Sequence, residues 1–122
     1  MKRKIHLYIA DILAAMNNAE KFIGTMSYEG FFLDEKTTYA VIRCIEIIGE
    51  ATKNITDDIR QKYMDVPWRD MAGMRDKVSH SYFGVDYEKV WLVVKKDIPH
   101  LKPLLQQILT EVQRDELHED KT

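Results

Sequence analysis

The apolar positions along the chain recur with the spacing of helices almost throughout. Over residues 5–26, apolar side chains return at intervals of three and four, which is the period of one face of an α-helix. The same spacing runs over residues 35–55 and again over residues 86–112. No stretch of the sequence alternates apolar and polar residues as a half-buried strand does. The pattern therefore predicts an all-α fold with three long amphipathic helices.

Capping residues mark where the helices begin and add two short helices to the three long ones. Asp34 and Asp86 stand immediately before periodic segments and are predicted N-caps, because a carboxylate can accept the free N–H groups of a first turn. Thr56 is the predicted cap of a short helix over residues 57–63. Pro67 is predicted at the first position of a second short helix, where its missing N–H costs no hydrogen bond. Tight connections between these helices predict an up-and-down bundle.

Three segments interrupt the regular spacing. Residues 27–33 are predicted to form a connector with a short helical turn, and residues 81–84 the exit from the helix that Pro67 opens. Pro99 lies inside the last periodic segment. Because proline removes a backbone donor and crowds the preceding turn, we expect a kink near residues 95–97, or a break there with Asp97 as a new cap.

Length and composition limit the chain to one domain. Its 122 residues are 45% hydrophobic and 31% charged, as in an ordinary soluble globular domain. Residues 1–115 are predicted to form the bundle and residues 116–122 a polar, frayed tail. The apolar runs are too short to cross a bilayer, so no membrane partner is expected. Cys44 is the single cysteine, which excludes an intramolecular disulfide, fits a cytoplasmic protein, and is predicted to be buried and inert among isoleucines.

The net charge of −2 gives no overall nucleic-acid signature. Residues 60–102, however, contain nine Lys and Arg against six Asp and Glu, a local excess of 9 − 6 = +3. Such an excess could help to hold a phosphate polymer, and it could equally be ordinary scatter of surface charges. Both interpretations stay open at this point.

Most residue patterns that carry chemistry are missing. The sequence has no glycine-rich phosphate loop and no pair of Glu and His at helical metal-binding spacing, so neither a cofactor nor a metal is predicted. Glu46 and Glu50 share a helix face, but without histidine partners they are predicted to be solvated or packing charges. His6, His100 and His118 are predicted to be surface histidines.

One polar cluster remains, in the segment 75–83. It combines an arginine that can hold a phosphate, Arg75, with a histidine suited to proton transfer near neutrality, His80. Five residues along an α-helix turn through about 140°, so these two side chains do not share a face of a regular helix. They can converge only if the helix ends before His80 or if a second subunit completes the site. The alternative is an ordinary surface pair at a helix end.

The same cluster, read with its flanks, resembles a known family. The pattern R-x4-H-x-Y at positions 75–82, within the context of residues 67–86 and 40–51, is similar to the motif of HEPN proteins. The branch it resembles most is HepT, the toxin of HEPN/MNT toxin–antitoxin pairs, and the resemblance covers roughly residues 8–110. It implies a HEPN-like helical bundle that acts as a metal-independent endoribonuclease.

The resemblance also implies a role for each residue of the motif. His80 is expected to act as general base or acid, and Arg75 to hold the phosphate. Asp76 is expected to orient a neighbour or the RNA, and Lys77 is a weaker candidate for a phosphate contact. Tyr82 is expected to be the acceptor of an AMP group that silences the enzyme.

Three partners are implied as well: a second copy of the chain, so that paired motifs line one cleft; an MNT-type minimal nucleotidyltransferase acting as antitoxin; and an RNA substrate, tRNA or mRNA. The near-neutral charge disfavours tight non-specific RNA binding and favours selective cutting of a structured RNA. Two other functions stay open. The chain could be a non-catalytic helical dimer that binds and regulates a nucleotidyltransferase, or a sensor that binds a nucleotide between its helices.

Overall fold

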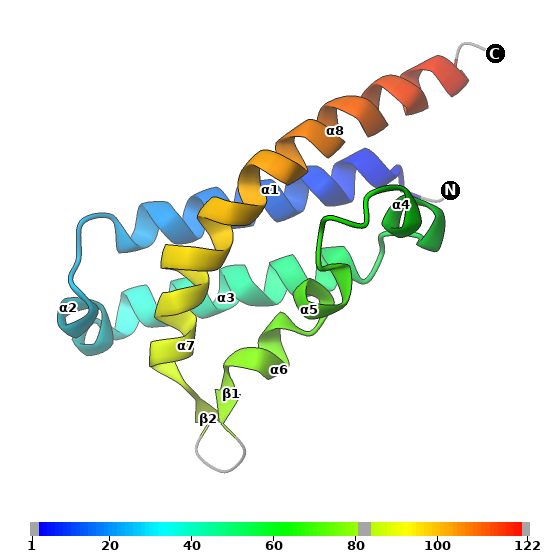
Figure 1. The fold of residues 1–122 in the computed structure, drawn as a ribbon. Helices are drawn as coiled ribbons and strands as arrows, with labels where there is room; N and C mark the ends of the chain where they lie inside the picture. Colours follow the sequence, from blue (N-terminus) through cyan, green and yellow to red (C-terminus); the bar gives the residue numbers. More distant parts are fainter. Residues whose placement is uncertain (1–2, 81–83, 121–122) are drawn as a thin grey trace.

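Three long helices form the body of the molecule in the computed structural model, which describes residues 3–80 and 84–120 (Figure 1). They are α1 (Ile5–Ile23), α3 (Glu35–Thr52) and α8 (Ile98–Asp120). Helix α1 packs along α3 on one side and along α8 on the other. The all-α bundle predicted from the sequence is thereby confirmed.

Short elements connect and cover the long helices. In chain order they are α2 (Tyr28–Leu33), α4 (Asp57–Lys62), α5 (Trp68–Ala72), α6 (Met74–Val78), β1 (Ser79–His80), β2 (Gly84–Val85), α7 (Tyr87–Leu92) and a π-helical turn η1 (Val93–Asp97). The helical turn expected within residues 27–33 is α2. The two very short strands were not predicted, because two residues are too few to show an alternating pattern.

All three predicted caps occupy the N-cap position of a helix, and two of them accept a backbone N–H as predicted. Asp34 Oδ1 accepts from the Thr37 N–H at 3.0 Å, and Asp86 Oδ1 accepts from the Lys89 N–H at 3.1 Å. Thr56 does occupy the N-cap position of α4, but its hydroxyl donates to the Asp58 carboxylate instead of accepting a backbone N–H.

The position predicted for Pro67 is wrong by one residue. Pro67 is the N-cap of α5, with ψ 72°, and the first helical residue is Trp68. The helix predicted from Pro67 to the segment 81–84 is also divided in two, because α5 ends at Ala72 and α6 begins at Met74 with Gly73 between them. Glycine is a poor residue for a helix interior, and here it separates two single turns.

The irregularity predicted before Pro99 is a π-helical turn rather than a break. The Ile98 N–H donates to the carbonyl of Val93, five residues earlier, so one wide turn is inserted where Pro99 cannot donate. The chain then continues directly as α8. The predicted location is correct, and the alternative in which Asp97 caps a new helix is wrong.

Helix α8 continues to Asp120, and the frayed tail expected over residues 116–122 stays a prediction. Its acidic last turns lie beside the basic start of the chain. Lys4 Nζ contacts Asp120 Oδ1 at 2.6 Å, and His6 Nδ1 contacts Glu116 Oε2 at 2.9 Å. These contacts between residues more than 100 positions apart hold the last turns against the start of α1.

The core lies where α1, α3 and α8 face one another, closed at one end by Phe31 from α2. Its fully buried members include Ile9, Ile12, Met16, Ile45, Ile48, Ile98 and Leu105. Cys44 is buried beside them, and burial raises the pKa of its thiol. This confirms the predicted buried cysteine. Within residues 3–80 and 84–120, no helix is long and apolar enough to cross a membrane.

Candidate active site

Arg75, Asp76 and Lys77 are the exposed residues of α6, a single helical turn. Its apolar residues Met74 and Val78 are buried and fasten the turn to the core. The three charged residues between them are exposed. A short helix with two anchors and a polar stretch between them therefore presents these side chains to solvent without disturbing the core.

The helix ends before it reaches His80. Its last residue is Val78, and the next two residues pair with Gly84 and Val85 as a small antiparallel ladder. Three features stop the helix here. The Ser79 hydroxyl donates to the Arg75 carbonyl at 2.8 Å, the Asp86 N–H donates to the Val78 carbonyl at 2.7 Å, and Gly84 supplies a φ of +84° that favours glycine.

This ending satisfies one of the two conditions for Arg75 and His80 to converge. The two residues are on different elements, Arg75 on α6 and His80 on β1, so the 140° offset of a regular helix does not apply to them. The side chain of His80 and all of Tyr82 lie outside the described residues. The predicted roles of His80 and Tyr82 therefore stay predictions.

Arg75 faces an acidic residue of α3. Its Nη1 lies 3.6 Å from Glu46 Oε2, and the arginine side chain is 72% exposed, whereas Glu46 is 27% exposed. The sequence predicted Glu46 to be a solvated or packing charge, and its contact with the motif arginine was missed. Because 29 residues separate the two side chains, only tertiary packing brings them together.

A hollow of about 390 Å³ lies where α3 meets α5 and α6. Arg75 and Asp76 line it from α6, and Ser79 from the start of β1. Its other wall is the face of α3 that carries Glu46, Gly49, Glu50 and Lys53, residues spaced at three and four. Arg75 and Asp76 of the predicted site are thus brought together at one hollow.

Gly49 allows the two walls to come this close. A Cβ atom at this position would lie only 3.3 Å from the carbonyl oxygen of Ala72, a backbone atom at the end of α5. A glycine in the middle of an otherwise amphipathic helix is a sequence signal for such a close approach. This signal, with the acidic residues on the same face, could have pointed to Glu46.

Lys77 lies on another side of α6. Its Nζ is 3.0 Å from Asp97 Oδ2, and it lines a separate hollow of about 170 Å³ together with Asp70 and His100. The phosphate contact predicted for Lys77 stays a prediction. Arg75 lines a different hollow.

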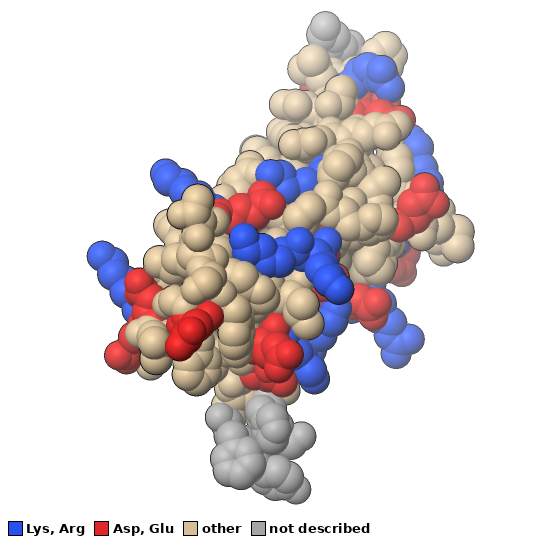
Figure 2. Space-filling view, turned by 60° about the vertical axis from the view of Figure 1, so that its left-hand side comes forward, with Lys and Arg blue, Asp and Glu red and all other residues tan. Residues whose placement is uncertain are grey.

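The charges around the Arg75 hollow are mixed. Its lining includes three carboxylates, from Glu46, Glu50 and Asp76, and two cations, from Lys53 and Arg75. Figure 2 shows the same mixture more widely, because Lys and Arg alternate with Asp and Glu on the face that it presents. One chain therefore offers no strongly basic groove at this site, in keeping with the net charge of −2.

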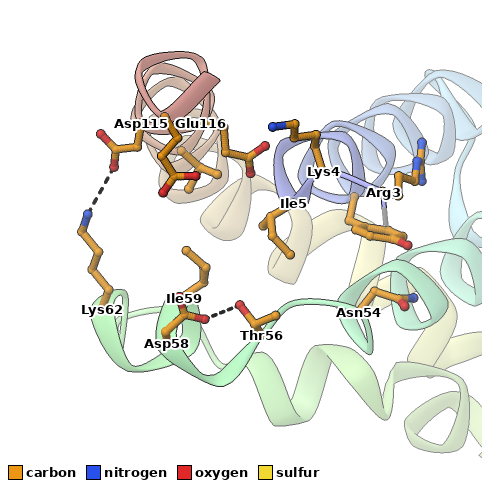
Figure 3. Close-up of a pocket in the computed structure, with 13 residues that line it drawn as sticks. Arg3, Lys4, Ile5, Asn54, Thr56, Asp58, Ile59, Lys62, Asp115 and Glu116 are labelled. Carbon is orange, nitrogen blue, oxygen red and sulfur yellow. Dashed lines mark hydrogen bonds and ion pairs between the residues drawn. The ribbon is translucent and has the colours of Figure 1, made fainter. Parts of the chain in front are cut away.

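A larger hollow, of about 730 Å³, lies elsewhere, between the start of α1, helix α4 and the last turns of α8 (Figure 3). None of the described motif residues, Arg75, Asp76 and Lys77, lines it. Its charged rim is held by contacts such as Lys62 Nζ to Asp115 Oδ2 at 3.4 Å. Among residues 3–80 and 84–120, no group of three or more His, Cys, Asp and Glu side chains could hold a metal ion.

Comparison with known proteins assigns the chain to a family. The sequence model of the family described as "Ribonuclease HepT-like" matches residues 12–108, which is most of the chain and includes every motif residue discussed above. The chain belongs to the HepT-like ribonuclease family. This confirms the predicted resemblance to HepT and the predicted ribonuclease class, and no solved structure gave a significant match.

Individual relatives agree with this assignment. The protein named "Probable ribonuclease HepT" of Thermococcus cleftensis is 47% identical over 108 residues, 88% of this chain and 98% of that protein. The RNase-named MJ0125 of Methanocaldococcus jannaschii is 46% identical over 112 residues, 92% of this chain and 97% of that protein. The RNase-named TTE0752 of Caldanaerobacter subterraneus is 41% identical over 102 residues, 84% of this chain and 91% of that protein.

Proposed function

We propose that this protein is the toxin of a HEPN/MNT toxin–antitoxin pair and that it cleaves RNA internally without a metal ion. The observation that carries the proposal is the ending of α6 at Val78, which leaves Arg75 on an exposed helical turn and places His80 on the strand beyond it. Membership of the HepT-like ribonuclease family supports the reaction class.

The reaction requires a base, an acid and a group that holds negative charge. His80 would take the proton from an RNA 2′-hydroxyl, whose oxygen then bonds to the adjacent phosphorus. Arg75 would hold the charge that develops on the phosphorane oxygens, since a guanidinium matches phosphate geometry. The bond to the 5′-oxygen breaks, and that oxygen takes a proton. The products are a 2′,3′-cyclic phosphate and a 5′-hydroxyl.

A homodimer would supply the second proton-transfer group. One histidine cannot be deprotonated to act as base and protonated to act as acid at the same moment. In a two-fold dimer, His80 of each copy would take one of these roles, and two Arg75 side chains would face the same phosphate backbone.

An MNT-type nucleotidyltransferase would silence the enzyme through Tyr82. It would transfer the AMP group of ATP to the tyrosine oxygen, with release of pyrophosphate and of the phenolic proton. The added phosphodiester is bulky and negatively charged, and it would lie two residues from His80. It would therefore compete with RNA for Arg75. Asp76 would orient a neighbour or the RNA within the same hollow.

The decisive test uses the full chain purified alone. It should cut tRNA or mRNA in the presence of EDTA, and end-group analysis of the fragments should find 2′,3′-cyclic phosphate and 5′-hydroxyl ends. Light scattering should give twice the 14.4 kDa chain mass. A folded protein that leaves RNA intact while binding the nucleotidyltransferase would instead favour the non-catalytic regulatory dimer. A saturable thermal shift with ATP alone would favour the nucleotide sensor.

A further inference from the structure

The contact between Arg75 and Glu46 leaves the arginine free to bind a second anion. The Nη1 to Oε2 distance of 3.6 Å is longer than the roughly 2.7–3.2 Å of an N–H···O hydrogen bond, so the pair is held by charge alone. The guanidinium carries several N–H donors in a planar fork. With 72% of the side chain exposed, these donors remain accessible to a phosphate.

Glu46, in contrast, stands on a well-fixed support. It follows Ile45 in α3, and Ile45 and Ile48 are fully buried in the core. The close approach of Gly49 to Ala72 fixes α3 against the end of α5, directly before the turn that carries Arg75. The carboxylate is therefore attached to the rigid wall of the hollow, and the arginine to a short and exposed turn.

An exposed arginine with no fixed partner samples many rotamers, and a bound phosphate must restrict them. A carboxylate at one edge of the guanidinium reduces this freedom before the substrate arrives. Exposed ion pairs of this kind are weak, so the guanidinium can turn its remaining N–H donors toward a phosphate while one edge stays beside Glu46. Glu46 can thus hold Arg75 at the hollow without keeping it from RNA.

We propose that Glu46 is a positioning residue that holds the Arg75 guanidinium at the hollow where the scissile phosphate binds. The inference rests on the proposed RNA cleavage and adds a residue of α3 to the site. Glu46 touches neither the RNA nor the reacting atoms. It acts through Arg75, and its carboxylate near the phosphate is tolerated because Arg75 lies between them.

The test is a double-mutant cycle on RNA cleavage by the full chain. Glu46→Ala should lower kcat about 10-fold with KM changed less than about twofold, because misplacement of a transition-state group affects mainly the chemical step. Glu46→Gln keeps the side-chain length and an acceptor oxygen, and should recover part of that loss. In an Arg75→Ala background, Glu46→Ala should have almost no further effect.

Glu20→Ala is the matched control. Glu20 is also a helical glutamate, 32% exposed and paired with a cation, Lys102 Nζ at 2.7 Å, but it lies on α1 away from the Arg75 hollow. The Glu20→Ala variant should cleave RNA at the wild-type rate. The proposal is overturned if Glu46→Ala cleaves faster, which would make Glu46 a competitor of RNA. The proposal is also overturned if Glu46→Ala lowers cleavage equally in the wild-type and Arg75→Ala backgrounds, or if Glu20→Ala lowers cleavage as much as Glu46→Ala does.

A second readout separates this inference from the proposed function. If the wild type does not cut RNA, the proposed function fails, but the pair can still be observed in the protein by NMR. The Arg75 Nε–Hε resonance, assigned by its loss in Arg75→Lys, should shift and become more mobile in Glu46→Ala and not in Glu20→Ala. An unchanged Arg75 resonance in Glu46→Ala would show that Glu46 does not hold the arginine.

Discussion

The two main hollows of this protein differ in what their charges do. In the hollow of about 730 Å³ between α1, α4 and α8, the charged residues contact one another across elements, as Lys62 and Asp115 do at the rim (Figure 3). In the hollow of about 390 Å³, the contact of Arg75 with the described residues is a long one to Glu46, and the arginine is largely exposed. The larger hollow is lined by residues near both ends of the chain, and the smaller hollow has an exposed arginine that can bind an anion. Availability of charge, rather than size, distinguishes the candidate active site.

The largest expected effect is the loss of cleavage on removing the motif residues. His80→Ala and Arg75→Ala should each lower cleavage by at least about 100-fold, because one variant loses proton transfer and the other loses stabilisation of the phosphorane. The melting temperature of Arg75→Ala should stay close to that of the wild type, since Arg75 is largely exposed. Lys62→Ala, at the larger hollow, should cleave normally. A normal rate in His80→Ala would remove the catalytic assignment.

The second prediction concerns Tyr82. Coexpression with a cognate nucleotidyltransferase should add AMP to Tyr82 and abolish cleavage, because the phosphodiester competes with RNA for Arg75. Tyr82→Phe lacks the acceptor oxygen but keeps the ring, so it should cleave at least in part and escape modification. Mass spectrometry of peptides locates the adduct. An adduct on Tyr63 or Tyr87 would contradict the assignment and leave the ribonuclease proposal intact.

A third prediction tests the close approach of α3 to α5. Gly49→Ala gains helix propensity of up to about 1 kcal/mol but forces a Cβ against the Ala72 carbonyl, and overpacking costs about 1–3 kcal/mol. We expect a net loss of about 1 kcal/mol in unfolding free energy and a severalfold loss of cleavage. Gly73→Ala is the control for stability, because its Cβ would meet the Arg69 and Asp70 carbonyl oxygens at ordinary distances of 3.5 and 4.0 Å. Equal unfolding curves for Gly49→Ala and wild type would show that the packing is less tight than the geometry indicates.

The fourth prediction compares two lysines near the motif. Lys53 lines the Arg75 hollow and has only a 3.8 Å contact with Glu50, whereas Lys77 is held by Asp97 at 3.0 Å. Lys53→Ala should therefore lower kcat/KM by about threefold and make kcat/KM less dependent on salt concentration. Lys77→Ala should lower kcat/KM by about twofold at most. The measurement is cleavage across a salt series. A larger effect at Lys77 would make it the phosphate contact predicted from the sequence.

The smallest effect is expected at the rim of the larger hollow. The Lys62–Asp115 pair is 56% and 53% exposed, and exposed pairs contribute about 0–1 kcal/mol. Asp115→Ala should lower the unfolding free energy by less than about 1 kcal/mol, and the difference should shrink at high salt. Urea unfolding at two salt concentrations measures it. A loss of several kcal/mol would mean that this hollow carries more of the stability than its exposure implies.

The sequence by itself determined the helical class and most helix starts. Apolar spacing and side-chain caps act over three or four residues, so Asp34 and Asp86 could be assigned without any tertiary information. The segment 75–82 was found in the same way, because its residue types and spacing are local. The irregular turn before Pro99 was located correctly for the same reason, because a proline inside a periodic segment is a local signal.

Tertiary structure alone decided what surrounds Arg75 and where the chain stops being helical. The contact with Glu46 joins residues 29 positions apart, and it exists because α3 packs against α5 and α6 at Gly49. The ending of α6 at Val78 depends on pairing with residues 84–86. The extension of α8 to Asp120 depends on cations at the other end of the chain. Each is a contact between distant segments, whose free energy no local pattern of residues contains.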